Sequence, residues 1–253
     1  MKVFIKIFLI IFFTFTGIIS FSQSEKLIDT LSNNILFQKE MKGGIIIHNR
    51  GFGLKFQKGG NINAFKKQFF EVEAVTMQAL KQVKVVNSYY YNAKPYYFGK
   101  LNNLYIFRGG LGIEKLLNSK PYWGGVELLY NYSGGVSVGL AVPIYLSIIN
   151  YSPYSYNYTL ETKRYDPEIH FQDIIYGRGP LFKGIGELGF HPGIYGKAGL
   201  NFEFGTYNTK ISSLEIGAII DVYPTGIALM AEESKSYAFL TLFFSVSFGK
   251  KYN

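Results

Sequence analysis

Apolar and polar residues alternate with a period of two through most of the chain after residue 43. The alternation is clearest in three segments near the C-terminus, 194–206, 212–222 and 238–248, where apolar side chains occupy every second position. Successive side chains of a β-strand point to opposite faces, so each segment predicts a strand with one apolar face. Strands of about 10 residues with this pattern are typical of barrels that cross a membrane.

Earlier segments follow the same period less regularly, and with the three above they make a set of eight strands. These segments are 43–57, 65–74, 105–114, 126–132 and 136–148. An even count is what single-chain bacterial barrels require. We therefore predict an all-β fold, an antiparallel up-and-down transmembrane β-barrel of eight strands. Ten strands remain an alternative, because the segment 77–97 has room for more.

The lengths of the connections predict an orientation if the C-terminus is periplasmic. Residues 133–135 and 207–210 then form short periplasmic turns, whereas 151–193 and 224–235 form external loops, the usual asymmetry of such barrels. Segment 77–97 does not fit this scheme, because it makes a long periplasmic connection. The barrel is predicted to occupy 43–253, and alternation from Tyr154 to Thr162 predicts that strands of the long loop project as a hairpin.

The first 42 residues divide into two predicted parts. Lys2 and Lys6 flank the start of an apolar run of about 13 residues that ends before Ser20 and Ser22, which is typical of a cleaved signal peptide at 1–22. A membrane anchor is the alternative, but a spanning helix needs roughly 20 residues. Residues 23–42 have weak helical spacing and are interpreted as a periplasmic lead-in. Export followed by insertion into the outer membrane is the predicted destination.

Composition supports export and limits how the protein is anchored. The chain has no cysteine, so neither a lipid on an N-terminal Cys nor a disulfide framework is available. The net charge of +9 becomes +7 when Lys2 and Lys6 leave with the signal, since 9 − 2 = 7. A basic balance also suits nucleic acid, but export makes anionic lipopolysaccharide or a periplasmic partner the expectation, and no nucleic-acid partner is predicted.

The polar faces of the strands distinguish a membrane barrel from a soluble one. A soluble ligand-binding barrel turns its charged face outward to water. Here the polar faces mix Gly, Ser, Asn, Tyr and scattered charges of both signs, which suits a crowded lumen whose charges pair across the interior. A structural plug of ion pairs and a narrow solute path are both open readings. The predicted lumen charge network comprises Lys67, Glu71, Glu73, Arg108, Glu114, Glu127, Lys197, Glu203, Glu215 and Asp221.

The predicted long external loop carries basic residues that suit the phosphates of lipopolysaccharide. Charge-assisted hydrogen bonds from guanidinium and ammonium groups bind phosphate well. Ordinary solvated charges are the alternative reading. The predicted contacts are Lys163, Arg164, Arg178 and Lys183.

The histidines are the residues most able to carry metal chemistry, but their spacing is unfavourable. A metal site requires His48, His170 or His191 to converge with carboxylates, and no HExxH-like spacing is present. The carboxylates nearest in sequence to His170 are Asp166, Glu168 and Asp173. His48 is interpreted as a hydrogen-bonding residue at a strand end or in the lumen, and no metal or cofactor is predicted.

Catalytic chemistry is an alternative without a motif. Some barrel enzymes act at the outer rim with His, Ser and carboxylate side chains, and His170, Asp173 and either Ser152 or Ser155 are of those types. No motif fixes their geometry, so no catalytic residue is predicted. The glycine-rich segments 177–180 and 184–186 are interpreted as flexible loop, because nothing places them between a strand and a helix as a nucleotide loop requires.

Four short segments carry a resemblance to a known family: 43–54 (GGIIIHNRGFGL), 99–102 (GKLN), 190–193 (FHPG) and 249–253 (GKKYN). On these residues the chain resembles a family of small, mostly uncharacterised outer-membrane β-barrel proteins of Gram-negative bacteria. The resemblance implies a porin-like barrel fold and an outer-membrane location over most of the mature chain, and it brings no known substrate or catalytic residue. Outer-membrane lipid, lipopolysaccharide and the barrel-insertion machinery are the implied partners.

The leading functional hypothesis is an integral outer-membrane barrel without enzymatic activity. Its role is structural, a surface interaction, or a narrow porin-like channel. One alternative is a barrel enzyme that acts on lipid A or envelope lipid, and another is a secreted soluble ligand-binding barrel. The sequence does not determine cargo or oligomeric state.

Overall fold

The computed structural model describes most of the chain beyond the predicted lead-in. The predicted signal peptide at 1–22 lies outside the described residues, and residues Phe37–Asn253 belong to one compact unit. No helix in the described part of the chain is long and apolar enough to cross a membrane. The described residues are 39–119, 125–151, 158–180, 183–204 and 210–252.

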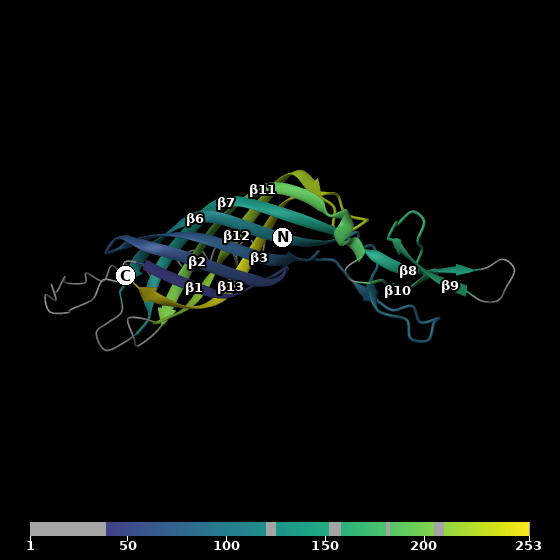
Figure 1. Ribbon diagram of the computed structural model, residues 1–253, viewed down its shortest axis with the longest axis horizontal. Helices are drawn as coiled ribbons and strands as arrows, with labels where there is room; N and C mark the ends of the chain where they lie inside the picture. Colours follow the sequence, from purple (N-terminus) through teal and green to yellow (C-terminus); the bar gives the residue numbers. More distant parts are fainter. Residues whose placement is uncertain (1–38, 120–124, 152–157, 181–182, 205–209, 253) are drawn as a thin grey trace, which may run out of the picture. The chain divides into compact units, whose positions relative to one another are not determined.

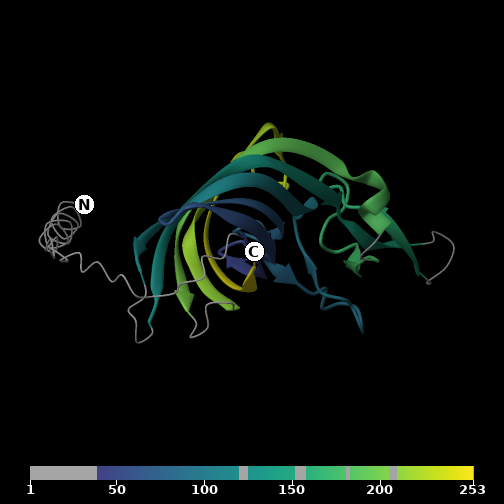
Figure 2. The ribbon, with the colours of Figure 1, turned by 60° about the vertical axis from the view of Figure 1, so that its left-hand side comes forward.

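Eight long antiparallel strands close into a barrel in which each strand pairs with its neighbours in chain order (Figure 1). The first and last of them complete the ring, from the pair Lys39 and Tyr252 to the pair His48 and Phe243. Viewed from another side, the strands curve around a common axis (Figure 2). The predicted eight-stranded up-and-down barrel is confirmed. Its strands are β1 (Lys39–His48), β2 (Gly51–Asn63), β3 (Lys66–Met77), β6 (Asn102–Asn118), β7 (Glu127–Pro143), β11 (Gly189–Phe204), β12 (Lys210–Ile227) and β13 (Ser236–Tyr252).

The predicted strand at 43–57 is wrong, because the chain turns within it. Asn49 and Arg50 form a turn that separates β1 from β2. The outward apolar residues change from odd positions, such as Ile47, to even positions, such as Phe52, across this turn. An uninterrupted strand keeps one parity. The change of parity was therefore a sequence signal for the turn.

The predicted turn at 133–135 is also wrong, because these residues lie inside β7. Ser133 pairs with Gly112 on β6 and with Lys197 on β11, so the ladder is continuous on both sides. The outward residues Tyr132 and Val136 share one parity across the segment. Three small residues in a row resemble a turn, but in a tightly curved barrel small side chains also suit a strand interior. One missed turn and one wrongly predicted turn together leave the predicted number of strands at eight.

These corrections move one connection to the other end of the barrel. Residues 78–101, which join β3 to β6, lie at the same end as the other long connections, 144–188 and 228–235. The expected long connection beside the C-terminus is therefore not present. The opposite end has the connections 64–65, 119–126 and 205–209, and most of the turn predicted at 207–210 lies outside the described residues.

Several boundaries differ from the prediction by a few residues. The barrel begins at Lys39 rather than 43, so the first strand includes the end of the predicted lead-in. The strand β11 begins at Gly189, and the connection predicted as 151–193 runs from 144 to 188.

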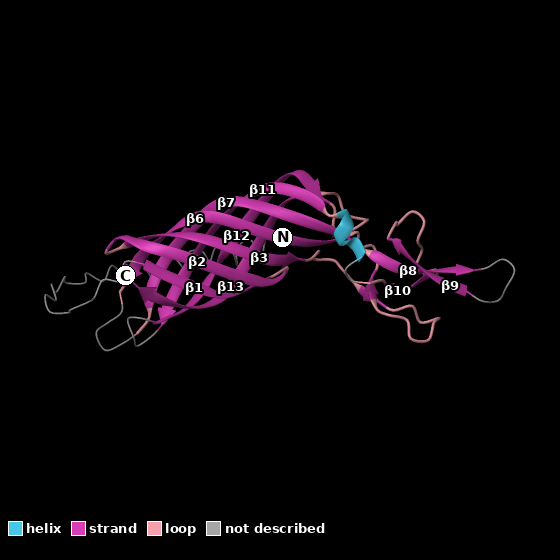
Figure 3. Ribbon diagram, viewed as in Figure 1, coloured by secondary structure: helices cyan, strands magenta, loops and turns pink. Residues whose placement is uncertain are grey.

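The long connections 78–101 and 144–188 fold into what we call the outer module. Its main sheet has the strand order β10 (Ile175–Arg178), β8 (Tyr145–Tyr151), β9 (Tyr158–Arg164). A small ribbon of β4 (Lys84–Val85) with β5 (Tyr96–Tyr97) and a short 3-10 helix at Lys183–Glu187 complete it (Figure 3). The pairing of β8 with β9 agrees with the predicted hairpin. The module has its own buried cluster, which includes Tyr96, Leu146, Ile148, Tyr165 and Ile175.

Candidate functional site

The outer surface of the barrel is apolar on all eight strands. Leu54 on β2, Val136 on β7 and Leu242 on β13 are 66%, 64% and 65% exposed. A barrel that is stable in water instead exposes its polar face, whereas a barrel in lipid presents an apolar band outward. Other exposed residues of this surface are Ile45, Ile47, Phe52, Phe56, Phe70, Val72, Tyr105, Phe107, Leu111, Tyr130, Tyr132, Phe190, Ile194, Phe204, Ile216, Ile220, Val222, Leu240, Phe244 and Phe248.

The inner surface carries the predicted lumen charges. Lys67 is partly buried, and Glu127 is partly buried opposite Glu203 in the β7–β11 register. The local period of two was sufficient to assign these side chains to the inner face, because the alternation within each strand separates its apolar face from its polar face. The fully buried members of the predicted set are Glu71, Glu73, Arg108, Glu114, Lys197, Glu203, Glu215 and Asp221.

Lys197 lies at the centre of this network. Its ammonium nitrogen is 2.6 Å from Glu73, 3.2 Å from Glu71 and 3.3 Å from Glu215, and it lies 4.8 Å from the centroid of the Phe243 ring. These partners come from β3, β12 and β13, so one side chain from β11 connects opposite parts of the wall. Removing a single member of such a group leaves an uncompensated charge in a dry interior.

Arg108 forms the next contact along the barrel. Its guanidinium donates through Nε and Nη2 to the two carboxylate oxygens of Asp221, at 2.9 and 2.8 Å, and through Nη1 to Glu73 at 3.0 Å. The side chains of all three residues are fully buried. The planar guanidinium suits this two-pronged contact, which lysine cannot make.

Further members of the network were not predicted from the sequence. Glu40 and Lys42 fell in the predicted lead-in, yet Lys42 is 2.7 Å from Glu114 and Glu40 is 2.9 Å from Lys67. Lys55, which pairs with Glu215, shares the odd parity of the outward residue Ile47, so a single strand at 43–57 places it on the outward face. The parity change between Ile47 and Phe52 was the signal that reverses this assignment. Lys251 was also missed, and it pairs with Glu203 at 2.5 Å.

An apolar layer replaces the charges at the end of the lumen that carries the long connections. The rings of Tyr223 and Phe239 meet edge to face with centroids 5.9 Å apart, and Phe239 is completely buried. A Cβ atom added to Gly193 would lie 2.6 Å from the Tyr223 ring, so glycine makes room for that ring. We define the apolar layer as Ile46, Val75, Met77, Leu104, Ile106, Ile219, Tyr223, Ile227, Phe239 and Phe243.

The two parts of the lumen have different physical consequences. The ion pairs are buried and mutually compensating, which is the condition under which charges are tolerated in a low-dielectric interior. Apart from the Tyr223 hydroxyl, the side chains of the apolar layer offer no hydrogen-bonding partner to water or to an ion. An eight-stranded barrel is narrow enough for its side chains to fill it, and here they do so as a core.

The basic residues predicted to contact lipopolysaccharide do not form one patch. Arg164 is 3.3 Å from Glu187, and the Lys183 ammonium lies 5.7 Å from the centroid of the Tyr145 ring on the same side of the sheet. Lys163 is 2.6 Å from Glu161. In the strand register, Lys163 on β9 pairs with Leu146 on β8, and Arg178 on β10 pairs with the same residue from the other side of β8.

The histidines lie apart and each has its own partner. His170 Nδ1 accepts a hydrogen bond from the backbone N–H of Asp166 at 3.0 Å, and burial lowers the pKa of this imidazole. His48 Nδ1 accepts from the backbone N–H of Arg50 at 3.3 Å, as expected of a strand-end residue. His191 Nδ1 is 2.8 Å from the Thr225 hydroxyl oxygen.

Those residues considered for metal or catalytic roles that the structure describes do not form a shared centre. Among the described residues, no group of three or more His, Asp or Glu side chains is placed to hold a metal ion. The carboxylate of Asp173 accepts a hydrogen bond from the backbone N–H of Ile174 at 3.1 Å. Ser152 and Ser155 lie outside the described residues.

Gly177, in the glycine-rich segment 177–180, has a packing role. A Cβ atom at Gly177 would lie 2.3 Å from the carbonyl oxygen of Lys94. Asn87, in the same connection as Lys94, donates its side-chain N–H to the carbonyl oxygen of Ile175 at 2.8 Å. These contacts attach the connection 78–101 to β10.

A group of tyrosines covers part of the outer module. The Tyr90 ring is 5.7 Å from that of Tyr158 and 5.9 Å from that of Tyr176, measured between centroids. A hydrogen bond between the hydroxyl groups of Tyr90 and Tyr151 raises the pKa of Tyr90 to about 12. The two tyrosines that flank this residue in the sequence, Tyr89 and Tyr91, are 88% and 92% exposed.

Comparison with known proteins finds a likeness among solved structures only. No family model matches the sequence, and no curated protein matches it. Among solved structures, the chain is similar to Ail, the attachment invasion locus protein of Yersinia pestis, with 7% identity and a TM-score of 0.38 over 85% of this chain and 98% of that one. The structure of Ail with the heparin analogue sucrose octasulfate gives 8% identity and a TM-score of 0.39 at the same coverage. Such values carry no statement about ligands, and the family suggested by the resemblance stays a prediction.

Proposed function

We propose that this chain is an integral outer-membrane β-barrel that does not conduct solutes and that displays its outer module as an interaction surface. The observation that carries the proposal is the apolar layer, a buried cluster at the end of the lumen that carries the long connections. Ions and polar solutes need a hydrated or polar path, and a packed apolar layer provides none.

The membrane location rests on the apolar exterior. Burying that surface in lipid removes from water the exposed side chains of all eight strands. The long connections at one end correspond to the external side, and the C-terminus with the short connections to the periplasmic side. Export by a cleaved signal peptide at 1–22 and insertion by the barrel-insertion machinery belong to the proposal.

The surface role rests on the outer module. It has a buried cluster of its own and also exposes large apolar and aromatic side chains, including Tyr89, Tyr91, Ile169 and Phe171, the last two at 63% each. Exposed aromatic groups on a folded support are characteristic of interaction surfaces.

Contact with lipopolysaccharide is a secondary part of the proposal. Lys163 and Arg164 already have carboxylate partners in Glu161 and Glu187. Arg178 and Lys183 form no ion pair with the described residues, so these two are the better candidates for phosphate groups.

The first experiment is membrane fractionation, with gel mobility compared before and after boiling. We expect the protein in the outer-membrane fraction and a mobility shift on boiling. A soluble protein without a shift would instead favour the secreted ligand-binding barrel.

The second experiment is conductance in planar lipid bilayers. We expect no channel activity from the refolded protein, with a porin in the same membranes as the positive control. Steady single-channel steps from the refolded protein would overturn the non-conducting proposal and favour the channel. Altered lipid A in a deletion strain would instead favour the enzyme.

A further inference from the structure

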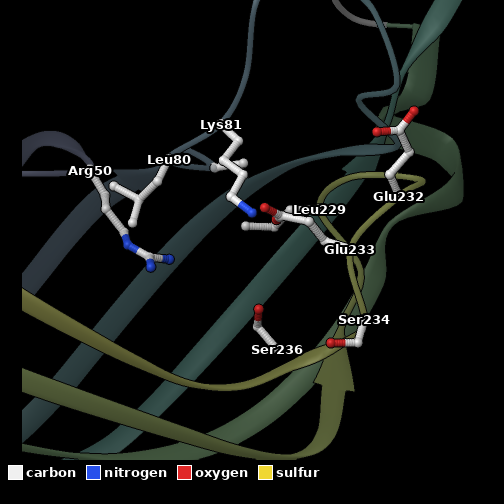
Figure 4. A pocket seen from close by; sticks show the side chains of 9 residues that line it. Arg50, Leu80, Lys81, Leu229, Glu232, Glu233, Ser234 and Ser236 are labelled. Carbon is white, nitrogen blue, oxygen red and sulfur yellow. The ribbon is translucent and has the colours of Figure 1, made fainter.

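A cavity of about 430 Å³ opens above the apolar layer, where three connections meet (Figure 4). Arg50 lines it from the β1–β2 turn, Lys81 from the connection after β3, and Glu232, Glu233 and Ser236 from the chain that leads into β13. The cavity lies within the size range of small-molecule sites. It takes no part in the charge network of the lumen.

Arg50 is the residue around which the cavity is built. Its guanidinium carbon lies 5.5 Å from the centroid of the buried Phe239 ring. Its backbone is held at both sides, because its N–H donates to His48 Nδ1 at 3.3 Å and its carbonyl accepts from the Gln78 N–H at 2.8 Å. The position of the side chain is therefore well supported.

The guanidinium of Arg50 lacks a counter-charge. Its Nε atom is buried without a hydrogen-bond partner, and no carboxylate among the described residues forms an ion pair with it. A buried donor without a partner is unfavourable. A carboxylate entering the cavity would supply an acceptor, and arginine binds such groups in a two-pronged geometry.

The walls of the cavity carry opposite charges. Arg50 and Lys81 supply cations on one side, whereas Glu232 and Glu233 supply carboxylates from the connection before β13. In Figure 4 the Lys81 ammonium and the Glu233 carboxylate point toward one another, and the Ser236 hydroxyl points into the space between the walls. An adjoining cavity of about 290 Å³ shares Lys81, Glu232 and Glu233, which extends the acidic side.

We propose that this cavity binds a small zwitterion, with its carboxylate at Arg50 and its ammonium at Glu232 and Glu233. Charge complementarity favours a zwitterion over a polyanion or a simple cation. The second negative charge of a polyanion would be repelled by the two glutamates, and a simple cation would be repelled by Arg50 and Lys81. The site is independent of whether the outer module binds a macromolecule.

The test compares three probes of equal chain length: 4-aminobutyrate, butyrate and butylammonium. The protein is held in lipid nanodiscs, binding is measured by calorimetry, and the side-chain Nε resonance of Arg50 reports the site. We expect 4-aminobutyrate to bind at least about tenfold more tightly than either single-charge probe, since a second matched charge contributes on the order of 1.4 kcal/mol.

Variants separate the two halves of the site. Arg50→Gln is expected to abolish binding of 4-aminobutyrate, and Glu232→Gln with Glu233→Gln to reduce its affinity to that of butyrate. The control is Arg164→Gln, which removes an arginine that pairs with Glu187 in the outer module and leaves the cavity intact. The mobility shift on boiling verifies that each variant folds.

Three results would overturn the inference. Equal affinity for butyrate and 4-aminobutyrate would show that Glu232 and Glu233 do not bind the ammonium group. Unchanged binding in Arg50→Gln, or the absence of saturable binding by any probe in the folded wild type, would remove the site itself.

Discussion

Arg108 on β6 holds Asp221 on β12 through both carboxylate oxygens, across the interior of the barrel. The contact joins strands that are not neighbours in the ring, because β7 and β11 lie between them. Glu73 on β3 accepts a hydrogen bond from Nη1 of the same guanidinium. The pair therefore ties opposite parts of the wall together beside the apolar layer, since Asp221 is the register partner of Phe239.

Replacing this arginine should be strongly destabilising. Arg108→Met leaves Asp221 buried without its partner, whereas Glu73 keeps Lys197 at 2.6 Å. We expect a loss of about 3–5 kcal/mol in the free energy of unfolding. The measurement is a urea titration in lipid vesicles, followed by the gel-mobility difference between folded and unfolded protein.

A second substitution and a surface control complete this test. Adding Asp221→Asn to Arg108→Met should recover part of the loss, because the uncompensated charge is removed. Arg164→Met breaks an ion pair whose arginine side chain is 61% exposed, and it should change the free energy of unfolding by about 0–1 kcal/mol. Equal effects of Arg108→Met and Arg164→Met would contradict the importance of the buried pair.

The apolar exterior predicts sensitivity to charge in lipid. Leu242 is 65% exposed on the outer face of β13, so Leu242→Arg should lower the free energy of unfolding in vesicles by roughly 2–4 kcal/mol. Leu160→Arg is the matched control, because Leu160 is 49% exposed on β9 of the outer module. If both arginine variants unfold at the wild-type urea concentration, the exterior of the barrel does not face lipid.

The outer module should loosen in acid because of His170. Burial lowers the pKa of His170 from its ordinary value of 6.5, Lys163 lowers it further, and Asp166 opposes both. The imidazole must be neutral for Nδ1 to accept the Asp166 N–H. Stability from this contact is therefore complete above pH 6.5 and is lost as the pH falls through the lowered pKa, since the unfolded chain takes up the proton first.

NMR titration of the His170 ring measures this directly. The midpoint should lie below 6.5 in the folded protein, and Asp166→Asn should lower it further, because the carboxylate favours the charged imidazole. The chain unfolded in urea supplies the reference. A folded midpoint above that reference would contradict the role given to burial.

The close approach of two connections predicts a steric effect at one glycine. Gly177→Ala places a Cβ atom 2.3 Å from the Lys94 carbonyl oxygen, so the connection 78–101 must move away from β10. Overpacking of this kind is unfavourable by about 1–3 kcal/mol. We expect faster protease cleavage within 78–101, whereas Gly186→Ala, whose Cβ has no neighbour within 4 Å, should behave as wild type.

The sequence by itself determined the strands and their faces. Alternation within one strand is a local property, so the inward direction of Lys197, Glu215 and Asp221 followed from their neighbours alone. The same reasoning failed at 43–57, where the turn at Asn49 and Arg50 was missed, and at 133–135, where three small residues imitated a turn. The parity of the outward apolar residues distinguishes the two cases, because it changes within 43–57 and is kept across 133–135. This parity is also a local property of the sequence.

Only the tertiary structure decided which inward residues meet. Phe239 and Tyr223 share the inward parity with charged residues, and nothing in their own strands shows that they join Ile46 and Ile106 in one apolar layer. Strand pairing and ring closure bring together residues far apart in the chain, and the tilt of the strands decides which positions share a level. The cavity around Arg50 arises in the same way, since its walls come from three separate connections.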